Sequence, residues 1–505
     1  MTLKKCMSIL SICFIFVFCL QSQTKTFDGY TFVFSGKKVY LYDMDKKVLN
    51  TWTVQNNIEG CADLLRDSSI IVSAKAPNST YSLALPHGRF QIINWKGEVT
   101  WDYTYSSSEY TPHHDIEPVY RTNDPKEKPT FLVPCYTSWG DKIVELKPTG
   151  KTTAEVIWEW NGSDHNCESG CSDKADVMDK SKGGVGCFNK TSDAMHVNNV
   201  SYNRTLDQII VNCKGFNELF VIDRSTTTAQ AKTSSGGKYG KGGRILYRWG
   251  SPSNYGISSE KKAFNGQHHG CWVPDTMPGT NLPIPGAGNF MAVDNGNKRV
   301  IEFLNPAKNG VFSRTAGQAF EPKTILWTYT PSGLASNEGS IQKLPNGNYL
   351  ICTGGVSGGF GFGGGGGGGG GSSGSKVYEV APNGTSGGTV VWELGDFGYS
   401  TEGYRYAYGY LNQSTPIKKL SSNQIAGNSY KITTMCSNNH TLIRVNNFKD
   451  NAHITLFSLS GKMLCSGFYK TQKCITFDPG IIPKGIYLVS ISTENHKITD
   501  RVSIH

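Results

Sequence analysis

The sequence predicts an all-β protein, namely a six-bladed β-propeller followed by a small β-sandwich-like domain at the C-terminus. Three observations lead to this prediction: one hairpin pattern recurs six times, glycine is abundant at 58 residues, and no long helical periodicity follows the first few dozen residues. A chain of 505 residues is long for a single compact core. A toroidal fold removes this difficulty because it grows by adding blades around one axis.

The repeated unit is an apolar strand, a polar turn, and a second strand in which an aromatic residue follows an apolar pair. Alternation of period two on both sides of a turn with Asp, Asn, Gly or Lys is typical of an antiparallel hairpin. The six copies end at these aromatic residues: Trp52, Trp101, Trp158, Tyr247, Trp327 and Trp392. A β-sandwich with long hairpins is the alternative, but six copies of one hairpin favour a ring.

The N-terminus predicts a signal peptide over residues 1–22. Lys4 and Lys5 precede an apolar run that ends at Leu20, in the order of a secretory signal. The run is short for a membrane span, which needs about 20 residues. A lipoprotein signal at Cys19 is disfavoured because bulky Phe18 precedes that cysteine. We expect no stable transmembrane segment in the mature chain.

The remaining sequence divides into three parts. We place the propeller at 23–411, a polar linker at 412–435 and the small C-terminal domain at 436–505. The glycine tract at 358–374 is predicted to be a loop within the propeller. It is not a phosphate-binding loop because no helix follows it.

Cysteine usage fits an oxidising compartment. The chain has 14 cysteines, of which three lie in the signal peptide. Cys167, Cys171 and Cys187 share a short insertion, so we expect a local disulfide there. A zinc knuckle that includes His165 is a less favoured alternative for an exported protein.

The formal charge of +10 is not gathered into a long basic run, which argues against nucleic acid as a partner. It is compatible with attraction of a small anionic substrate. The sequence contains no motif for a nucleotide or flavin, and we expect no cofactor and no resident metal.

Histidines recur where each propeller blade should begin its innermost strand. Equivalent positions of successive blades surround the central channel, and three of the five such segments carry histidine: His114 or its neighbour His113, His196, and His268 or its neighbour His269. With only 11 histidines in the chain, this recurrence indicates a functional site in the channel. Neighbouring side chains point to opposite faces of a strand, and we favour His114 and His268 as the inward members.

The C-terminal 70 or so residues resemble the sorting domain of bacterial type IX secretion. The resemblance rests on ITLFSLSGKML at 454–464, IIPKGIYLVSIS at 481–492 and the closing ITDRVSIH. It implies export through the periplasm to the cell surface or the medium, with the secretion machinery as a partner.

The propeller resembles the aryl-sulfate sulfotransferases over about residues 30–410. The matching motifs arrive in the order of that family: HHDIEP at 113–118, MHVNNVSYN at 195–203, NELFVIDR at 217–224, NGQHHG at 265–270, VDNGNKRVIEF at 293–303 and GSIQKLPNGNYLICTGG at 339–355. The resemblance implies transfer of a sulfuryl group from an aryl sulfate to a phenol, without a nucleotide donor, through a sulfated channel histidine.

Carried over residue by residue, the resemblance assigns the nucleophile to His268 and supporting roles to His196 and His114. Lys214 stands where the family has arginine, so it keeps the positive charge and loses the planar fork that grips two oxygens. Four further residues are predicted to contact substrate: Asn198, His113, His269 and Arg405. Arg405 is assigned to the strand that closes the ring, where it faces either the channel mouth or the packing of the closure.

Two other functions are consistent with the same residues. One is a non-catalytic binding propeller at the cell surface. The other is a metal-dependent hydrolase, in which the three channel histidines hold zinc and leave a fourth position open.

Overall fold

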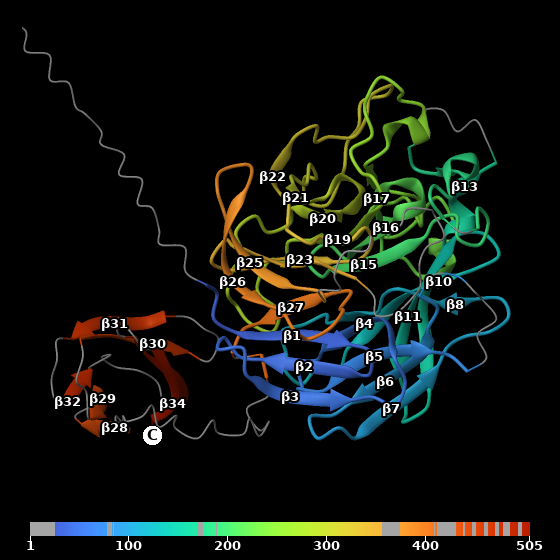
Figure 1. The fold of residues 1–505 in the computed structure, drawn as a ribbon. Helices are drawn as coiled ribbons and strands as arrows, with labels where there is room; N and C mark the ends of the chain where they lie inside the picture. The colour runs from blue at the N-terminus through green and yellow to red at the C-terminus, as the bar shows by residue number, and fades with distance from the viewer. Residues whose placement is uncertain are drawn as a thin grey trace, which may run out of the picture.

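The propeller prediction is confirmed by a computed structural model of the chain. Six antiparallel sheets follow one another around a common centre (Figure 1). The structure describes residues 26–77, 83, 85–168, 175–187, 189–355, 374–408, 410–411, 431–437, 440–446, 451–458, 463–469, 474–477, 485–492 and 497–504. The predicted signal peptide, almost all of the glycine tract and residues 412–430 of the predicted linker lie outside these ranges.

Blade 1 joins the two ends of the propeller. Its innermost strand is β27 (Gly403–Tyr406), which pairs with β1 (Tyr30–Ser35) near the start of the chain (Figure 1). The sheet continues through β2 (Lys38–Tyr42) and β3 (Val48–Thr53). The ring is therefore closed by backbone hydrogen bonds between segments more than 350 residues apart.

Each of the other blades runs outwards from the channel in chain order. Their strands are β4 (Ile58–Leu64), β5 (Ile70–Lys75), β6 (Gly88–Ile93) and β7 (Val99–Thr104) in blade 2; β8 (Thr111–Pro112), β9 (Glu117–Val119), β10 (Thr130–Tyr136), β11 (Asp141–Pro148) and β12 (Ala154–Asn161) in blade 3; β15 (Val197–Asn203), β16 (Gln208–Cys213), β17 (Glu218–Asp223) and β18 (Tyr247–Trp249) in blade 4; β19 (Gln267–Trp272), β20 (Phe290–Asp294), β21 (Arg299–Phe303) and β22 (Ile325–Tyr329) in blade 5; and β23 (Ser340–Lys343), β24 (Tyr349–Cys352), β25 (Val377–Pro382) and β26 (Gly388–Leu394) in blade 6.

Short elements decorate the loops between these strands. They are the parallel pair β13 (Asn166–Cys167) and β14 (Met178–Asp179), the helix α1 (Thr228–Ala231), and the 3₁₀ turns η1 (Gly162–His165), η2 (Lys180–Lys182), η3 (Lys214–Phe216), η4 (Pro252–Tyr255) and η5 (Asn295–Asn297). The turns η3 and η5 matter for function because each joins the second and third strands of its blade next to the channel.

The six repeated aromatic residues all lie on outermost strands, as the repeat predicts. Each one donates a hydrogen bond to the turn before the outermost strand of the next blade, so the six bonds run once around the ring. The pairs are Trp52 to the Asn94 carbonyl, Trp101 to the Thr153 carbonyl, Trp158 to the Thr226 hydroxyl, Tyr247 to the Glu321 carbonyl, Trp327 to the Gly387 carbonyl and Trp392 to the Met44 carbonyl. A buried indole needs such a partner for its N–H, which explains why the aromatic recurs.

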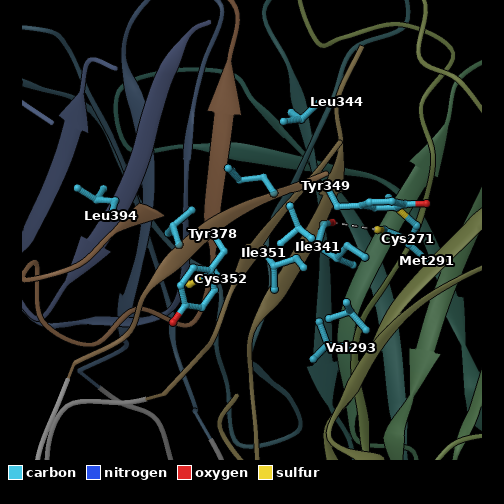
Figure 2. Close-up of a cluster of buried hydrophobic side chains, with 14 of the residues drawn as sticks. Cys271, Met291, Val293, Ile341, Leu344, Tyr349, Ile351, Cys352, Tyr378 and Leu394 are labelled. Carbon is cyan, nitrogen blue, oxygen red and sulfur yellow. Dashed lines mark hydrogen bonds between the residues drawn. The ribbon is translucent and has the colours of Figure 1, made fainter. Parts of the chain in front are cut away.

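Apolar side chains between neighbouring blades form the core. Figure 2 shows the cluster between blades 5 and 6, where Cys271 and Met291 of blade 5 meet Ile341 and Tyr349 of blade 6. The rings of Trp327 and Tyr349 stack with centroids 3.7 Å apart. Burial of such faces against the next sheet fixes the blades around the channel.

The C-terminal domain is also built only from strands in its described part. One sheet contains β28 (Lys431–Ser437), β29 (His440–Asn446) and β32 (Cys474–Phe477), and another contains β30 (Ala452–Ser458), β31 (Met463–Tyr469), β33 (Gly485–Ser492) and β34 (Lys497–Ile504). The first strand starts at Lys431, inside the segment predicted to be linker.

Candidate functional site in the propeller channel

The structure brings the four predicted catalytic residues together at the end of the channel where the innermost strands begin. His114 lies between β8 and β9, His196 directly before β15, His268 in β19 and Lys214 in η3. The rings of His114 and His196 have centroids 4.8 Å apart. Lys214 and His196 also act electrostatically on His268. Residues from three blades therefore face one small space.

The Nδ1 atom of each channel histidine is engaged in a hydrogen bond. His196 Nδ1 lies 2.9 Å from Asp193 Oδ1, and His268 Nδ1 lies 2.7 Å from Asn295 Oδ1. His114 Nδ1 lies 2.7 Å from Nδ1 of its neighbour His113. Since one nitrogen of each ring is fixed in this way, the other nitrogen, Nε2, remains for chemistry.

The orientation of Asn295 settles the tautomer of His268. The Asn295 amide nitrogen donates to the carbonyls of Ala335 and Glu338 at 3.1 and 2.7 Å, so Oδ1 is the atom that faces the histidine. Oδ1 can only accept, and His268 Nδ1 must therefore carry the proton. Neutral His268 consequently has an unprotonated Nε2.

Left-handed backbone occurs at two of the channel histidines, at Glu338 and at His269. His114, His196 and Glu338 have φ values of 58°, 48° and 63°, and His269 has 49°. These values lie in the left-handed region, which costs a residue with a side chain roughly 1–2 kcal/mol. Strain of this kind persists where the surrounding structure enforces it and is typical of functional sites.

Burial keeps the channel histidines neutral. It lowers the pKa of His114 and of His268 well below the usual 6.5, and the positive charge of Lys214 lowers the pKa of His268 further. The pKa of His196 is lowered by burial and by the same lysine. Lys214 makes no ion pair with any residue that the structure describes, so its charge is available to an anion.

Glu338 is a site residue that the sequence analysis missed. Its carboxylate lies 3.9 Å from Nε2 of His268, and burial raises its pKa to about 7. Glu338 precedes β23, at the position of blade 6 that corresponds to the histidines of blades 3 to 5. The repeat alignment already placed this segment beside the channel, but the search there was for histidine.

His113 is a supporting residue and does not contact substrate, which corrects the prediction. Its ring is fully buried and stacks on Tyr136 with centroids 3.5 Å apart. Its Nε2 lies 2.8 Å from Asp141 Oδ1. With the bond to His114, both of its nitrogens are occupied by protein groups.

Asn198 is likewise used by the protein itself. Its amide nitrogen donates to the Gln267 carbonyl at 2.9 Å, and its oxygen accepts from Asn212 at 2.6 Å. The predicted substrate-orienting amide instead joins blade 4 to the strand that carries His268.

The prediction that Arg405 contacts substrate is wrong. Its guanidinium is buried inside the blade, 3.4 Å from the Glu379 carboxylate and 4.5 Å from the centre of the Trp392 ring. Strand alternation places the preceding residue, Tyr404, on the channel side instead. The guanidinium therefore belongs to the closure of the ring.

His269 lies in a different pocket from His268, which also corrects the prediction. This pocket has a volume of about 210 Å³ and lies further along the innermost strands, where Asp63, Asp115, Glu117 and Tyr404 also line it. We call it the carboxyl pocket. The Nε2 atom of His269 lies 2.9 Å from the Tyr404 hydroxyl, which in turn donates to Glu402.

One set of side chains in the described part of the chain has the spacing of a metal site. The ligand atoms of Cys187, Asp193 and His196 lie within 4.8 Å of one another. The hydrogen bond between Asp193 and His196 already accounts for that contact. The three channel histidines do not form such a set among the described residues, so their spacing does not support the hydrolase alternative.

The cysteine predictions are confirmed in part. Cys167 takes part in a disulfide, whereas Cys187 is a free thiol. His165 is not arranged as a zinc ligand, because its Nε2 bonds the Ala231 carbonyl at 2.7 Å and its ring stacks on Trp160.

Comparisons with solved structures give distant likenesses. A 6-phosphogluconolactonase-like protein from Bacteroides uniformis is 10% identical, with 92% of this chain and 100% of that chain covered and a TM-score of 0.37. The periplasmic gluconolactonase of Pseudomonas aeruginosa is 10% identical over 90% and 99% of the two chains, with a TM-score of 0.36. The secretion component PorZ of Porphyromonas gingivalis is 9% identical over 95% and 74%, with a TM-score of 0.21. At these scores they carry no argument about function.

The sequence comparisons concern the C-terminal domain. No curated protein matches the chain. No helix in the described part of the chain has the length and apolar character to cross a membrane. Residues 437–505 match the family described as secretion system C-terminal sorting domain. The match does not extend to the propeller, whose resemblance to sulfotransferases remains a prediction from its motifs. The chain carries a type IX secretion sorting domain, and the protein is exported to the cell surface or secreted.

Proposed function

We propose that this protein transfers a sulfuryl group from an aryl sulfate to a phenolic acceptor through a sulfated His268. The observation that carries the proposal is the hydrogen bond from His268 Nδ1–H to Asn295 Oδ1. It leaves Nε2 as a bare nucleophile in a space that also contains a free cation and two further histidines.

The reaction would proceed in two halves. In the first, His268 Nε2 attacks sulfur, an N–S bond forms, and the aryl O–S bond breaks to release a phenolate. In the second, the acceptor oxygen attacks the same sulfur and the N–S bond breaks. A covalent intermediate divides one difficult transfer into two easier ones, and burial of His268 supports this role because it keeps the imidazole neutral.

Lys214 and His114 supply the remaining parts. The ammonium group of Lys214 neutralises the sulfate oxygens during transfer, in a buried site where such a charge has a large effect. His114 donates a proton to the departing phenolate and removes one from the acceptor. Glu338 lies beside His268 Nε2, and because its pKa is about 7 it can be neutral when the anionic donor binds.

The test is release of p-nitrophenol from p-nitrophenyl sulfate by the mature protein, with and without added phenol. We expect phenol to stimulate release, and His268→Gln to abolish it. His269→Gln is the matched control, because His269 is the next residue on β19 and lies in the carboxyl pocket, so it should retain the reaction. Intact mass of the donor-treated protein should show one added sulfuryl group in the wild type and the control alone.

Folded wild-type protein that releases no p-nitrophenol with any phenolic acceptor would contradict the proposal. The non-catalytic binding propeller would then be the better account. Activity that is retained in His268→Gln and lost on chelation would instead favour the metal-dependent hydrolase.

A further inference from the structure

We infer that Asp141, His113 and His114 form a proton relay, in which Asp141 stores the proton that one phenol takes up and the other gives away. The inference rests on the proposed function and extends it to Asp141, which lies outside the motifs of the sulfotransferase resemblance, and to a different role for His113. Asp141 and His113 touch no substrate in this scheme; they position His114 and exchange its proton.

The three side chains form one continuous line of hydrogen bonds. Asp141 Oδ1 lies 2.8 Å from His113 Nε2, and His113 Nδ1 lies 2.7 Å from His114 Nδ1. The ring of His113 is held in plane by Tyr136, which stacks on it at an angle of 6°. The second carboxylate oxygen of Asp141 accepts the amide of Val197 at 2.9 Å, so the carboxyl group cannot turn away from the line.

This geometry couples the two ends of the line. If Asp141 carries the proton, it donates to His113 Nε2, His113 Nδ1–H donates to His114 Nδ1, and His114 Nε2 must bear hydrogen. If Asp141 is ionised, donor and acceptor exchange roles in each hydrogen bond: His113 Nε2–H donates to Asp141, His114 Nδ1–H donates to His113 Nδ1, and His114 Nε2 carries no hydrogen. Both forms keep both imidazoles neutral, since each neutral ring carries one proton.

The two forms match the two halves of the reaction. In the donor half, His114 Nε2–H protonates the departing phenolate, His113 Nδ1–H moves to His114 Nδ1, and the Asp141 proton moves to His113 Nε2. In the acceptor half, the phenol gives its proton to His114 Nε2 and the same shifts run backwards. One proton leaves Asp141 and one returns in each cycle, so no external acid or base is required.

The surroundings of Asp141 suit a carboxyl group that holds a proton at rest. The group is buried, and among the described residues its only pairing within ion-pair distance is with His113. Burial raises its pKa well above the usual range.

The experiment compares two donors in single turnover without acceptor. An unsubstituted phenol, like a tyrosine side chain, titrates near 10, so its phenolate leaves poorly without a proton, whereas p-nitrophenolate is stable alone. We expect Asp141→Asn to slow sulfation of His268 by phenyl sulfate about 10²-fold, the usual range for loss of acid–base catalysis, and by p-nitrophenyl sulfate about threefold or less. His113→Gln should show the same selective loss.

Two controls separate proton transfer from structure. His87→Phe replaces a buried histidine outside the line of hydrogen bonds, whose neighbour Pro86 bridges His113, and it should affect both donors equally. Asp193→Asn should also affect both donors equally, because it only orients His196.

Equal loss on both donors in Asp141→Asn and His113→Gln would overturn the relay while leaving the proposed function intact. A selective loss in Asp193→Asn alone would overturn it by assigning the proton to His196. Wild-type protein that accepts sulfate from neither donor would overturn the proposed function and the relay with it.

Discussion

His268 and His269 are neighbours on β19, yet they belong to two regions of opposite chemistry. His268 donates from Nδ1 to Asn295 and presents a bare Nε2 to the channel. His269 does the reverse: its Nδ1 accepts the amide of Ile341 and its Nε2 faces the Tyr404 hydroxyl. One strand therefore supplies the proposed nucleophile to the histidine site and a structural group to the carboxyl pocket.

The electrostatics of the two regions differ in the same way. In the histidine site, burial and Lys214 hold basic groups in their neutral form. In the carboxyl pocket, burial raises the pKa of Asp115 to about 6, and burial together with the charge of Asp115 raises that of Glu117 to about 8, so Glu117 is neutral at pH 7. The comparison shows that burial favours the neutral form of both kinds of group, and that the lysine makes the histidine site the one suited to an anion.

The largest expected effect comes from removing the hydrogen bond that fixes the tautomer of His268. Asn295→Ala should lower sulfuryl transfer about 10³-fold, since a misoriented imidazole in a hydrolase triad costs up to about 10⁴. Asn297→Ala, in the same turn and exposed, is the control and should leave the rate unchanged. Steady-state rates with p-nitrophenyl sulfate and phenol measure the effect of both substitutions. Equal rates in the two variants would show that the Asn295 hydrogen bond is not needed for transfer.

The next effect concerns the charge that distinguishes the two regions. Lys214→Met should lower kcat/KM for an aryl sulfate about 10²-fold, as expected for one group that stabilises transferring oxygens. Lys214→Arg should retain most of the rate because it keeps the charge and presents a planar fork of donors that can bind two oxygens at once. If Lys214→Met and Lys214→Arg lower kcat/KM equally, the substrate does not use the positive charge at this position.

The smallest effect is on stability and tests the carboxyl pocket alone. Glu117 has its pKa raised to about 8 from the ordinary 4.5, so its contribution to stability is complete below pH 4.5 and is lost as the pH rises through 8. Glu117→Gln should therefore gain about 3 °C in Tm relative to wild type at pH 8.5 and little at pH 5.

Thermal unfolding at the two pH values measures this difference. Exposed Glu98→Gln is the control and should shift Tm equally at both. The histidine site should respond in the opposite direction. The pKa of His113 is lowered to about 3, so its contribution is complete above pH 6.5 and is lost as the pH falls towards 3. If Glu117→Gln raises Tm no more at pH 8.5 than at pH 5, the raised pKa of Glu117 is contradicted.

The fold was predictable because its determinants are local and repeated. The aromatic on each outermost strand is visible as a residue after an apolar pair, and six copies of it give the blade count. The histidines could be aligned for the same reason, since equivalent positions of a ring meet at its centre.

The wrong assignments concern residues whose partners are far away in sequence. Asn198 bonds Gln267, and Arg405 pairs with Glu379 in the neighbouring blade, and neither contact leaves a local pattern. Alternation shows that Tyr404 and Arg405 point to opposite faces, but it does not say which face is the channel. Asp141 was overlooked because it begins the third strand of its blade and reaches His114 through His113.

The closing strand also has a consequence for the life of the protein after export. The ring ends with β27 and the short segment after it, where Tyr410 and Leu411 are buried and the Tyr410 hydroxyl bonds the Leu64 carbonyl at 2.6 Å. The sorting domain comes only after this clasp, from residue 437. A protease that cuts between residues 411 and 437 would remove the sorting domain without removing a strand of the propeller, so export and the function of the propeller are separable in time.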